Sequence, residues 1–253
     1  MTAPVGTASE GRADRIRLLA QPVLIAVVAA GVLWWAFATP LTENQRASLT
    51  AAMIWTRVYQ HVLITVTVTA IVLAVGVPLG ILLTRRGMRL FAPPAIGVAN
   101  IGQAAPAIGL IVLLFLATGR TGFWTGVLPV AVYSLLPVLR NTIVGIRNVD
   151  PDLKLAARGQ GMTSLHVLRS VELPLAMPFI LAGLRTTLVL AVGTATLSFL
   201  AGAGGLGIFI DVGYRLQDHK TLVVGSVLAV CLALLVDWLG GVAEVLLRPK
   251  GLR

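Results

Sequence analysis

The residues that could carry out chemistry are few in this chain and lie far apart. His61, His166 and His219 are separated by long apolar segments, and the single cysteine, Cys231, lies inside one of those segments. A metal centre, or a nucleophile with its base, requires several such side chains to converge on one point. We therefore expect no catalytic residue, no metal site and no cofactor bound by this chain.

A second pattern with a possible chemical meaning is the glycine cluster Gly202, Gly204, Gly205 and Gly207, which contains the spacing G-x-G-x-x-G. In dinucleotide-binding proteins this spacing follows a short strand and opens a helix. Here it follows a long apolar run, so we predict instead a flexible or re-entrant outer segment that borders a translocation pathway. The chain also has no G-x-x-x-x-G-K-[ST] phosphate loop, so any ATP would be used by a partner protein.

Four polar side chains interrupt the apolar runs. Arg185 and Asp237 lie at similar depths in two of these runs and could form an ion pair. Alternatively, Arg185 could extend to the inner interface while Asp237 sits at the water boundary. Asn100 and Gln103 are three residues apart on one helix face, where they could bond neighbouring helices or line a polar pathway.

Helices in a lipid environment must position these side chains. The 253 residues are 57% hydrophobic and 12% charged, with a mean hydropathy of +0.91, which is too apolar for a water-soluble domain. A membrane-spanning helix needs about 20 apolar residues. We predict an all-α integral membrane protein with about six transmembrane helices, at about residues 18–38, 61–84, 94–117, 123–144, 176–200 and 221–245. Pro106 in the third span, and Pro129 and Pro137 in the fourth, predict kinked helices.

Lysine and arginine predict the orientation of these helices. Fourteen of them fall in one alternating set of loops and tails, and five fall in the other set. Because basic residues accumulate on the cytoplasmic side, we place both termini in the cytoplasm, with tails at residues 1–17 and 246–253. The same distribution accounts for the net charge of +10 without nucleic acid as a partner. Although Ala36-Phe37-Ala38 imitates a signal cleavage site, the preceding apolar run is near span length, so we expect the first helix to be retained.

The longest cytoplasmic connection, about residues 145–175 between spans four and five, carries signals for two short helices. Asp150 is a suitable N-cap, Pro151 fits the first helical position, and Gly161 can end the helix in a left-handed conformation. A second short helix is predicted from near Thr163 until Pro174 prevents regular continuation. Composition alone is also compatible with an amphipathic loop that rests on the membrane.

The stretch LAARGQGMTSLHVLRSVELPLAMP in this connection resembles the cytoplasmic signature loop of type I ABC importer permeases. The family pattern is E-A-A, three residues, G, nine residues, I, one residue, L-P. The matching positions are occupied by Ala156, Ala157, Gly161, Leu173 and Pro174, with Val171 in place of isoleucine. The acidic first position is Leu155 in this chain, which puts one polar contact of the loop in doubt.

The resemblance covers about residues 57–241 and implies that the loop docks as a coupling helix on a cytoplasmic ABC ATPase dimer. It also implies a second permease subunit, identical or related, an extracytoplasmic solute-binding protein, and a location in the bacterial inner membrane. The stretches VELPLAMPFILAGLRTT and FLAGAGGLG are most similar to permeases for osmoprotectants such as glycine betaine, carnitine, choline and proline. Methionine and sulfonate permeases share parts of these stretches and are the alternatives.

Two other classes of membrane protein compete with a permease. A secondary transporter or channel predicts ionisable residues at the bilayer midplane and an inverted repeat. A membrane enzyme predicts a nucleophile, base or metal ligands clustered at one membrane face. The sequence shows neither pattern convincingly, so our preferred hypothesis is an importer permease that works by alternating access. The sequence leaves open which solute is carried and whether the permease pair is homodimeric or heterodimeric.

Overall fold

The computed structural model describes residues 7–247, with side chains from residue 19 onward, and all regular structure in this part of the chain is helical. The longer helices are α1 (Thr7–Ala38), α3 (Ala51–Leu82), α4 (Ala92–Ala104), α5 (Ala107–Thr118), α6 (Phe123–Arg147), α9 (Leu173–Ala195) and α11 (His219–Leu247). The shorter ones are α2 (Glu43–Ser48), α7 (Pro151–Gly159), α8 (Ser164–Val167) and α10 (Gly207–Arg215). Short 3₁₀ helices cover Arg89–Phe91 and Ser198–Ala201, and a π turn covers Leu168–Glu172.

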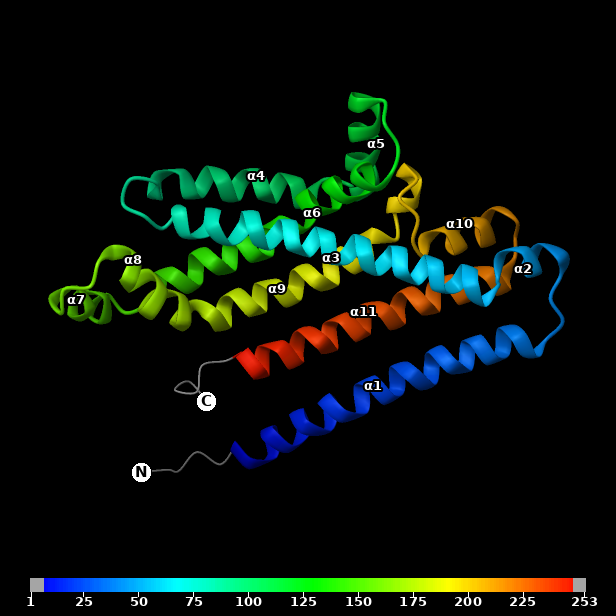
Figure 1. Cartoon of the computed structure of the whole chain (residues 1–253), viewed down its shortest axis with the longest axis horizontal. Coiled ribbons are helices and arrows are strands. Elements are labelled where there is room, and N and C mark those ends of the chain that lie inside the picture. The colour runs from blue at the N-terminus through cyan, green and yellow to red at the C-terminus, as the bar shows by residue number, and fades with distance from the viewer. Residues whose placement is uncertain (1–6, 248–253) are drawn as a thin grey trace.

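Apart from α5, which stands across the others, the long helices lie side by side in an elongated bundle (Figure 1). α6 packs against α9, α3 and α4, while α11 packs against α9, α10 and α1. The start of α1, the end of α11, the α3–α4 connection and the α7–α8 loop lie toward one end of the bundle, and α2 and α10 lie at the other end (Figure 1). This arrangement agrees with the predicted grouping of the basic segments on one side of the membrane. That this side is the cytoplasm stays a prediction.

Five helices are long and apolar enough to cross a membrane, and α4 with α5 gives a sixth crossing if the pair is one broken span. The five are α1 from Leu19 onward, α3, α6, the continuous helical segment Ser164–Ala195, and α11. The predicted fold class, an all-α membrane protein with about six transmembrane helices, is therefore confirmed.

The third predicted span is not one kinked helix but two helices that meet at 97°. The break lies at Ala105, whose backbone is extended, and at Pro106, which precedes α5. Proline has no N–H and disfavours a helical backbone at the residue before it, so α4 ends here instead of bending. In the fourth span, by contrast, Pro129 and Pro137 both lie inside the single helix α6.

The two predicted tails lie partly outside the described residues. This applies to residues 1–6 of the predicted 1–17 tail and to residues 248–253 of the predicted 246–253 tail. Within the described part, the backbone is already helical at Thr7 and α11 continues to Leu247. The first helix therefore begins earlier than the apolar run that predicted it.

The core of the bundle forms where α6 meets α3 and α9. Val68 of α3 is fully buried and packs in one cluster with Val130 and Val138 of α6. Glycine brings α9 against α6, because a Cβ on Gly183 would lie 2.8 Å from the carbonyl oxygen of Pro137. Lipid gives little hydrophobic drive for helices to associate, so close packing of this kind holds the bundle together.

Candidate functional site

The α7–α8 loop has capping residues at the predicted positions. The Asp150 side chain accepts a hydrogen bond from the Asp152 N–H at 2.8 Å, and Pro151 begins α7. Gly161 has a φ of +83°, and its N–H donates to the carbonyl oxygen of Arg158 at 2.9 Å. The short helix followed by a left-handed glycine is therefore confirmed as local geometry.

One side of α7 faces the bundle and the other side is exposed. Ala157 is buried, and Lys154 donates from Nζ to the carbonyl oxygen of Ile146 in α6 at 3.1 Å. Ala156 and Leu155 are exposed, with 70% of Leu155 accessible. The residue that replaces the acidic position of the signature is therefore presented on the free surface of α7.

The second helix of the loop does not end at Pro174, contrary to the prediction. Thr163 caps α8, and the π turn Leu168–Glu172 joins α8 directly to α9. A π turn accommodates an extra residue in the helix, which suits a stretch that leads into a proline without a free N–H. The predicted site residues Val171, Leu173 and Pro174 therefore lie where the loop continues into α9, and all three are half-buried.

An ion pair that the sequence analysis did not identify attaches this loop to the α3–α4 connection, just after α3. Glu172 is buried in the π turn, and its Oε2 accepts a hydrogen bond from Arg85 Nη2 at 2.5 Å. A buried carboxylate needs such a partner because removing its charge from water is costly. The available signal was a carboxylate in an otherwise apolar and basic stretch, but nothing in the sequence chooses Arg85 over the adjacent Arg86.

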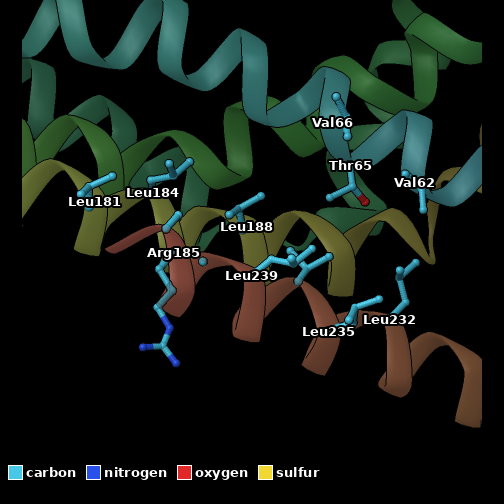
Figure 2. A pocket seen from close by; sticks show the side chains of 13 residues that line it. Val62, Thr65, Val66, Leu181, Leu184, Arg185, Leu188, Leu232, Leu235 and Leu239 are labelled. Carbon is cyan, nitrogen blue, oxygen red and sulfur yellow. The ribbon is translucent and has the colours of Figure 1, made fainter. Parts of the chain in front are cut away.

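Arg185 and Asp237 form the ion pair that was one of the two interpretations of the sequence. Arg185 Nε donates to Asp237 Oδ1 at 2.7 Å, and its Nη2 donates to Oδ2 at 2.8 Å. Glu244 adds a second carboxylate, with its Oε2 at 4.0 Å from Arg185 Nη1. A groove of about 440 Å³ adjoins the pair between α3, α9 and α11, and Figure 2 shows the guanidinium turned away from the leucine side chains of this groove. The pair thus ties α9 to α11.

Asn100 and Gln103 differ in their exposure. Asn100 is exposed on α4 and Gln103 is half-buried. No hydrogen bond joins either side chain to another residue in the part of the chain that the structure describes. Bonding to helices outside this chain and a role in a pathway both stay predictions.

The glycine segment, residues 202–207, is buried and closely packed over most of its length. Gly204, Gly205 and Gly207 are buried, and Gly202 is exposed. The N–H of Gly205 donates to Gln60 Oε1 of α3 at 3.1 Å. This burial argues against the predicted flexible form, because non-helical backbone inside a bilayer needs fixed hydrogen-bond partners. That the segment borders a pathway stays a prediction.

The sequence analysis also missed the two residues of α3 that contact this segment, Gln60 and His61. His61 is fully buried, and both of its ring nitrogens lie within hydrogen-bonding distance of backbone atoms, from Val192 and Leu206. The sequence offered a signal, since a histidine beside a long apolar run must find polar partners if it is buried. It did not indicate which segments supply them.

A polar site lies at the end of the bundle opposite the α7–α8 loop, where α2 meets the α10–α11 connection. Asp218 Oδ1 accepts from Gln45 Nε2 at 2.7 Å, and its Oδ2 accepts from Thr221 Oγ1 at 2.6 Å. Partial burial raises the pKa of Asp218, but hydrogen bonds from Thr221, Gln45 and Lys220 outweigh it, so this pKa lies below its usual 3.8. The ionised carboxylate fixes α2 to the bundle.

The described side chains supply connections between helices and no cluster of ligands. Within residues 19–247, no group of three or more His, Cys, Asp or Glu side chains could hold a metal ion. The polar groups join α9 to α11 and to α6, and the glycine segment to α3. They also join the α7–α8 loop to α6 and the adjoining π turn to the α3–α4 connection. Such an arrangement can transmit a displacement of the loop into the long helices.

Comparison with protein families and curated relatives gives consistent matches over most of the chain. The model of a family described as "Binding-protein-dependent transport system inner membrane component" matches residues 76–248. The osmoprotectant import permease protein OsmW of Salmonella typhimurium is 37% identical over 199 residues, which are 77% of this chain and 92% of that protein. The choline transport system permease protein OpuBB of Bacillus subtilis is 38% identical over 197 residues, 78% of this chain and 89% of that protein.

Among solved structures, the fold is similar to that of a chain of the MetNI methionine ABC transporter in an inward-facing conformation. The TM-score is 0.68 at 22% sequence identity, and the match covers 83% of this chain and 100% of the other. At this level of identity the similarity concerns the fold alone.

Proposed function

We propose, since the chain belongs to the family of binding-protein-dependent transport system inner membrane components, that it carries a small osmoprotectant such as glycine betaine, carnitine, choline or proline. Membership makes the chain a multi-pass inner-membrane permease subunit of an ABC importer. Such a subunit has no catalytic activity of its own, and ATP hydrolysis takes place in the partner subunit.

The solute class rests on one observation, the 37–38% identity to relatives named as osmoprotectant and choline permeases over more than three quarters of the chain. A third relative with 37% identity, from Bacillus subtilis, is named as a glycine betaine/carnitine/choline permease. Methionine transport has weaker support, because the methionine transporter is similar in fold at only 22% identity.

The α7–α8 loop is the contact with the cytoplasmic ATPase in this proposal. Its support is an exposed face with Leu155 and Ala156, opposite a face that Lys154 and Ala157 hold against the bundle. The Arg85–Glu172 ion pair adds a second attachment, between the π turn that follows the loop and the α3–α4 connection just after α3. A displacement of α7 by the ATPase would therefore act on α3, α6 and α9 together and switch the pathway between outward and inward access.

A second permease subunit, identical or related, completes the pathway, and an extracytoplasmic binding protein delivers the solute to the outer end. The exposed side of α4 is the surface that would face the second subunit or the pathway. Asn100 lies on this exposed side with Val98 and Ile101, and the half-buried Gln103 lies closer to the packed side. Polar side chains are costly against lipid, so this face suits a water-filled path or a partner subunit better than hydrocarbon.

Uptake by cells that lack other osmoprotectant importers tests the solute class. The chain is expressed with its ATPase and binding protein, and the cells are given labelled glycine betaine, carnitine, choline, proline or methionine. We expect uptake of at least one of the first four and none of methionine. Uptake of methionine alone would overturn the assignment, and the same cells without the ATPase provide the background.

A further inference from the structure

The backbone that follows α9 is irregular although it is buried in a membrane protein. The α9 helix ends at Ala195, and the next regular membrane-spanning helix begins only at His219. The residues between include Gly204 and Gly205, whose φ angles of +87° and +93° cannot belong to a right-handed helix. Free N–H and C=O groups in such a segment require partners, because the bilayer supplies no water.

Two adjacent residues of α3 provide those partners. Gln60 Oε1 accepts the Gly205 N–H at 3.1 Å, and His61 Nδ1 accepts the Leu206 N–H at 3.2 Å. His61 Nε2 lies 2.9 Å from the carbonyl oxygen of Val192, in the last turn of α9. Leu206, Val192 and His61 are all fully buried. One turn of α3 therefore connects to both the end of α9 and the glycine segment.

The hydrogen bonds define the protonation state of His61. Because the Leu206 N–H donates to Nδ1, that nitrogen carries no proton. The neutral ring then has its proton on Nε2, which donates to the Val192 carbonyl. His61 thus acts as an acceptor toward the glycine segment and as a donor toward α9, and these two roles can be separated by substitution.

The fit around these side chains is close. A Cβ on Gly204 would collide with the Gln60 amide, and a Cβ on Gly205 would lie 3.3 Å from His61 Nδ1. Gln60 is itself oriented by Arg57, whose Nη1 donates to Gln60 Oε1 at 3.0 Å. Glycine at these positions allows the backbone to approach α3 closely enough for both amides to reach their acceptors.

We infer that Gln60 and His61 are positioning residues for transport, which clamp the glycine segment to α3 at the outer end of α9. The other end of α9 continues into the π turn and the α7–α8 loop. Because α9 joins the loop to the clamp, the hydrogen bonds to α3 resist, at the far end of α9, a movement that starts at the loop. The role in transport rests on the proposed function, but the hydrogen bonds that form the clamp can be tested independently of that function.

Two substitutions of His61 separate its two contacts. In His61→Asn, the amide oxygen can take the place of Nδ1 and accept the Leu206 N–H. In His61→Gln, the longer amide can take the place of Nε2 and donate to the Val192 carbonyl, but no acceptor remains for Leu206. Both variants have a neutral amide, so a difference between them reports on the contact with the glycine segment.

The first measurement is hydrogen–deuterium exchange of the 202–207 segment in the purified full chain in nanodiscs. We expect exchange in His61→Gln to be about 5- to 160-fold faster than in the natural chain, the range for a buried donor that has lost its acceptor, and to be nearly unchanged in His61→Asn. Equal exchange in the two variants would overturn the clamp, whether or not the protein transports solute.

The second measurement is solute taken up per ATP hydrolysed in proteoliposomes of the complete importer. We expect the solute taken up per ATP to fall in His61→Gln and to stay at the natural value in His61→Asn. Gln60 offers an independent pair, because Gln60→Glu keeps an acceptor for Gly205 and Gln60→Leu removes it. If the solute taken up per ATP falls without faster exchange, or if the two members of each pair behave alike, the positioning role is wrong. If the exchange measurements support the clamp but the natural chain shows no ATP-driven uptake, the proposed function fails and the clamp stands.

Discussion

Replacing Gly161 with valine tests whether the turn between α7 and α8 is required for binding the ATPase. The φ of Gly161 is +83°, and a Cβ there would meet no atom within 4 Å, so the substitution changes backbone strain without a clash. A left-handed conformation costs an L-residue about 1–2 kcal/mol, and it is least tolerated by β-branched residues. That cost lowers the equilibrium constant between the native turn and its alternatives by roughly 5- to 30-fold.

The assay is the amount of ATPase recovered with the tagged permease after gentle detergent extraction, at matched permease amounts. We expect Gly161→Val to weaken ATPase binding by up to roughly 5- to 30-fold and to recover correspondingly less ATPase at subsaturating concentration, with normal membrane insertion. Gly87→Val is the matched control, because Gly87 lies in the α3–α4 connection, has open space for a Cβ and has no positive φ. Gly161→Asn should be milder, since asparagine tolerates this conformation. Recovery of ATPase with Gly161→Val equal to that of the natural chain would refute the reasoning.

Three further contacts give measurable outcomes. Reversal of Arg185 or Asp237 alone, to Asp and Arg respectively, should reduce the complex recovered by size-exclusion chromatography, and the double reversal should restore part of it; absence of any restoration would contradict the pair. Gly183→Leu should destabilise the bundle by about 1–3 kcal/mol and lower its melting temperature, because the new side chain must displace the Pro137 backbone of α6. The pKa of Asp218 is lowered in the folded state, so its stabilising effect is complete above pH 3.8 and is lost as the pH falls through the lower folded value. Proteolysis of the α2 segment should therefore increase below pH 3.8, and Asp218→Asn should abolish this pH dependence.

The sequence predicts those parts of the structure that depend on local signals. Apolar run length locates the spans, because bilayer thickness sets the number of residues in a crossing helix. The cap at Asp150 and the turn at Gly161 were also predictable, since each depends on the conformation of a few neighbouring residues. These local signals place the α7–α8 loop correctly.

Prolines show where local signals are insufficient. Pro106 breaks the third span, Pro137 stays inside α6, and Pro174 follows a π turn within one continuous helical segment. The same residue type has three outcomes because packing against neighbouring helices decides whether the freed backbone groups can be satisfied. Sequence reasoning gives the position of the disturbance but not its form.

The missed residues are those whose partners lie far away in the chain. Glu172 pairs with Arg85, and His61 contacts Val192 and Leu206 from another helix. Each side chain is recognisable as a polar group in an apolar setting, but only the fold specifies what it meets. The candidate functional site is therefore predictable where it is a contiguous loop and not where it is assembled between helices.

The most direct test of the central claim is purification of the tagged protein from its native membrane in mild detergent, followed by mass spectrometry of the proteins that remain bound. A permease of this family is expected to retain a nucleotide-binding ATPase, and ATP should drive solute uptake when the purified complex is placed in liposomes with its binding protein. A protein that is stably alone and moves its solute without ATP would contradict the account and identify a secondary carrier.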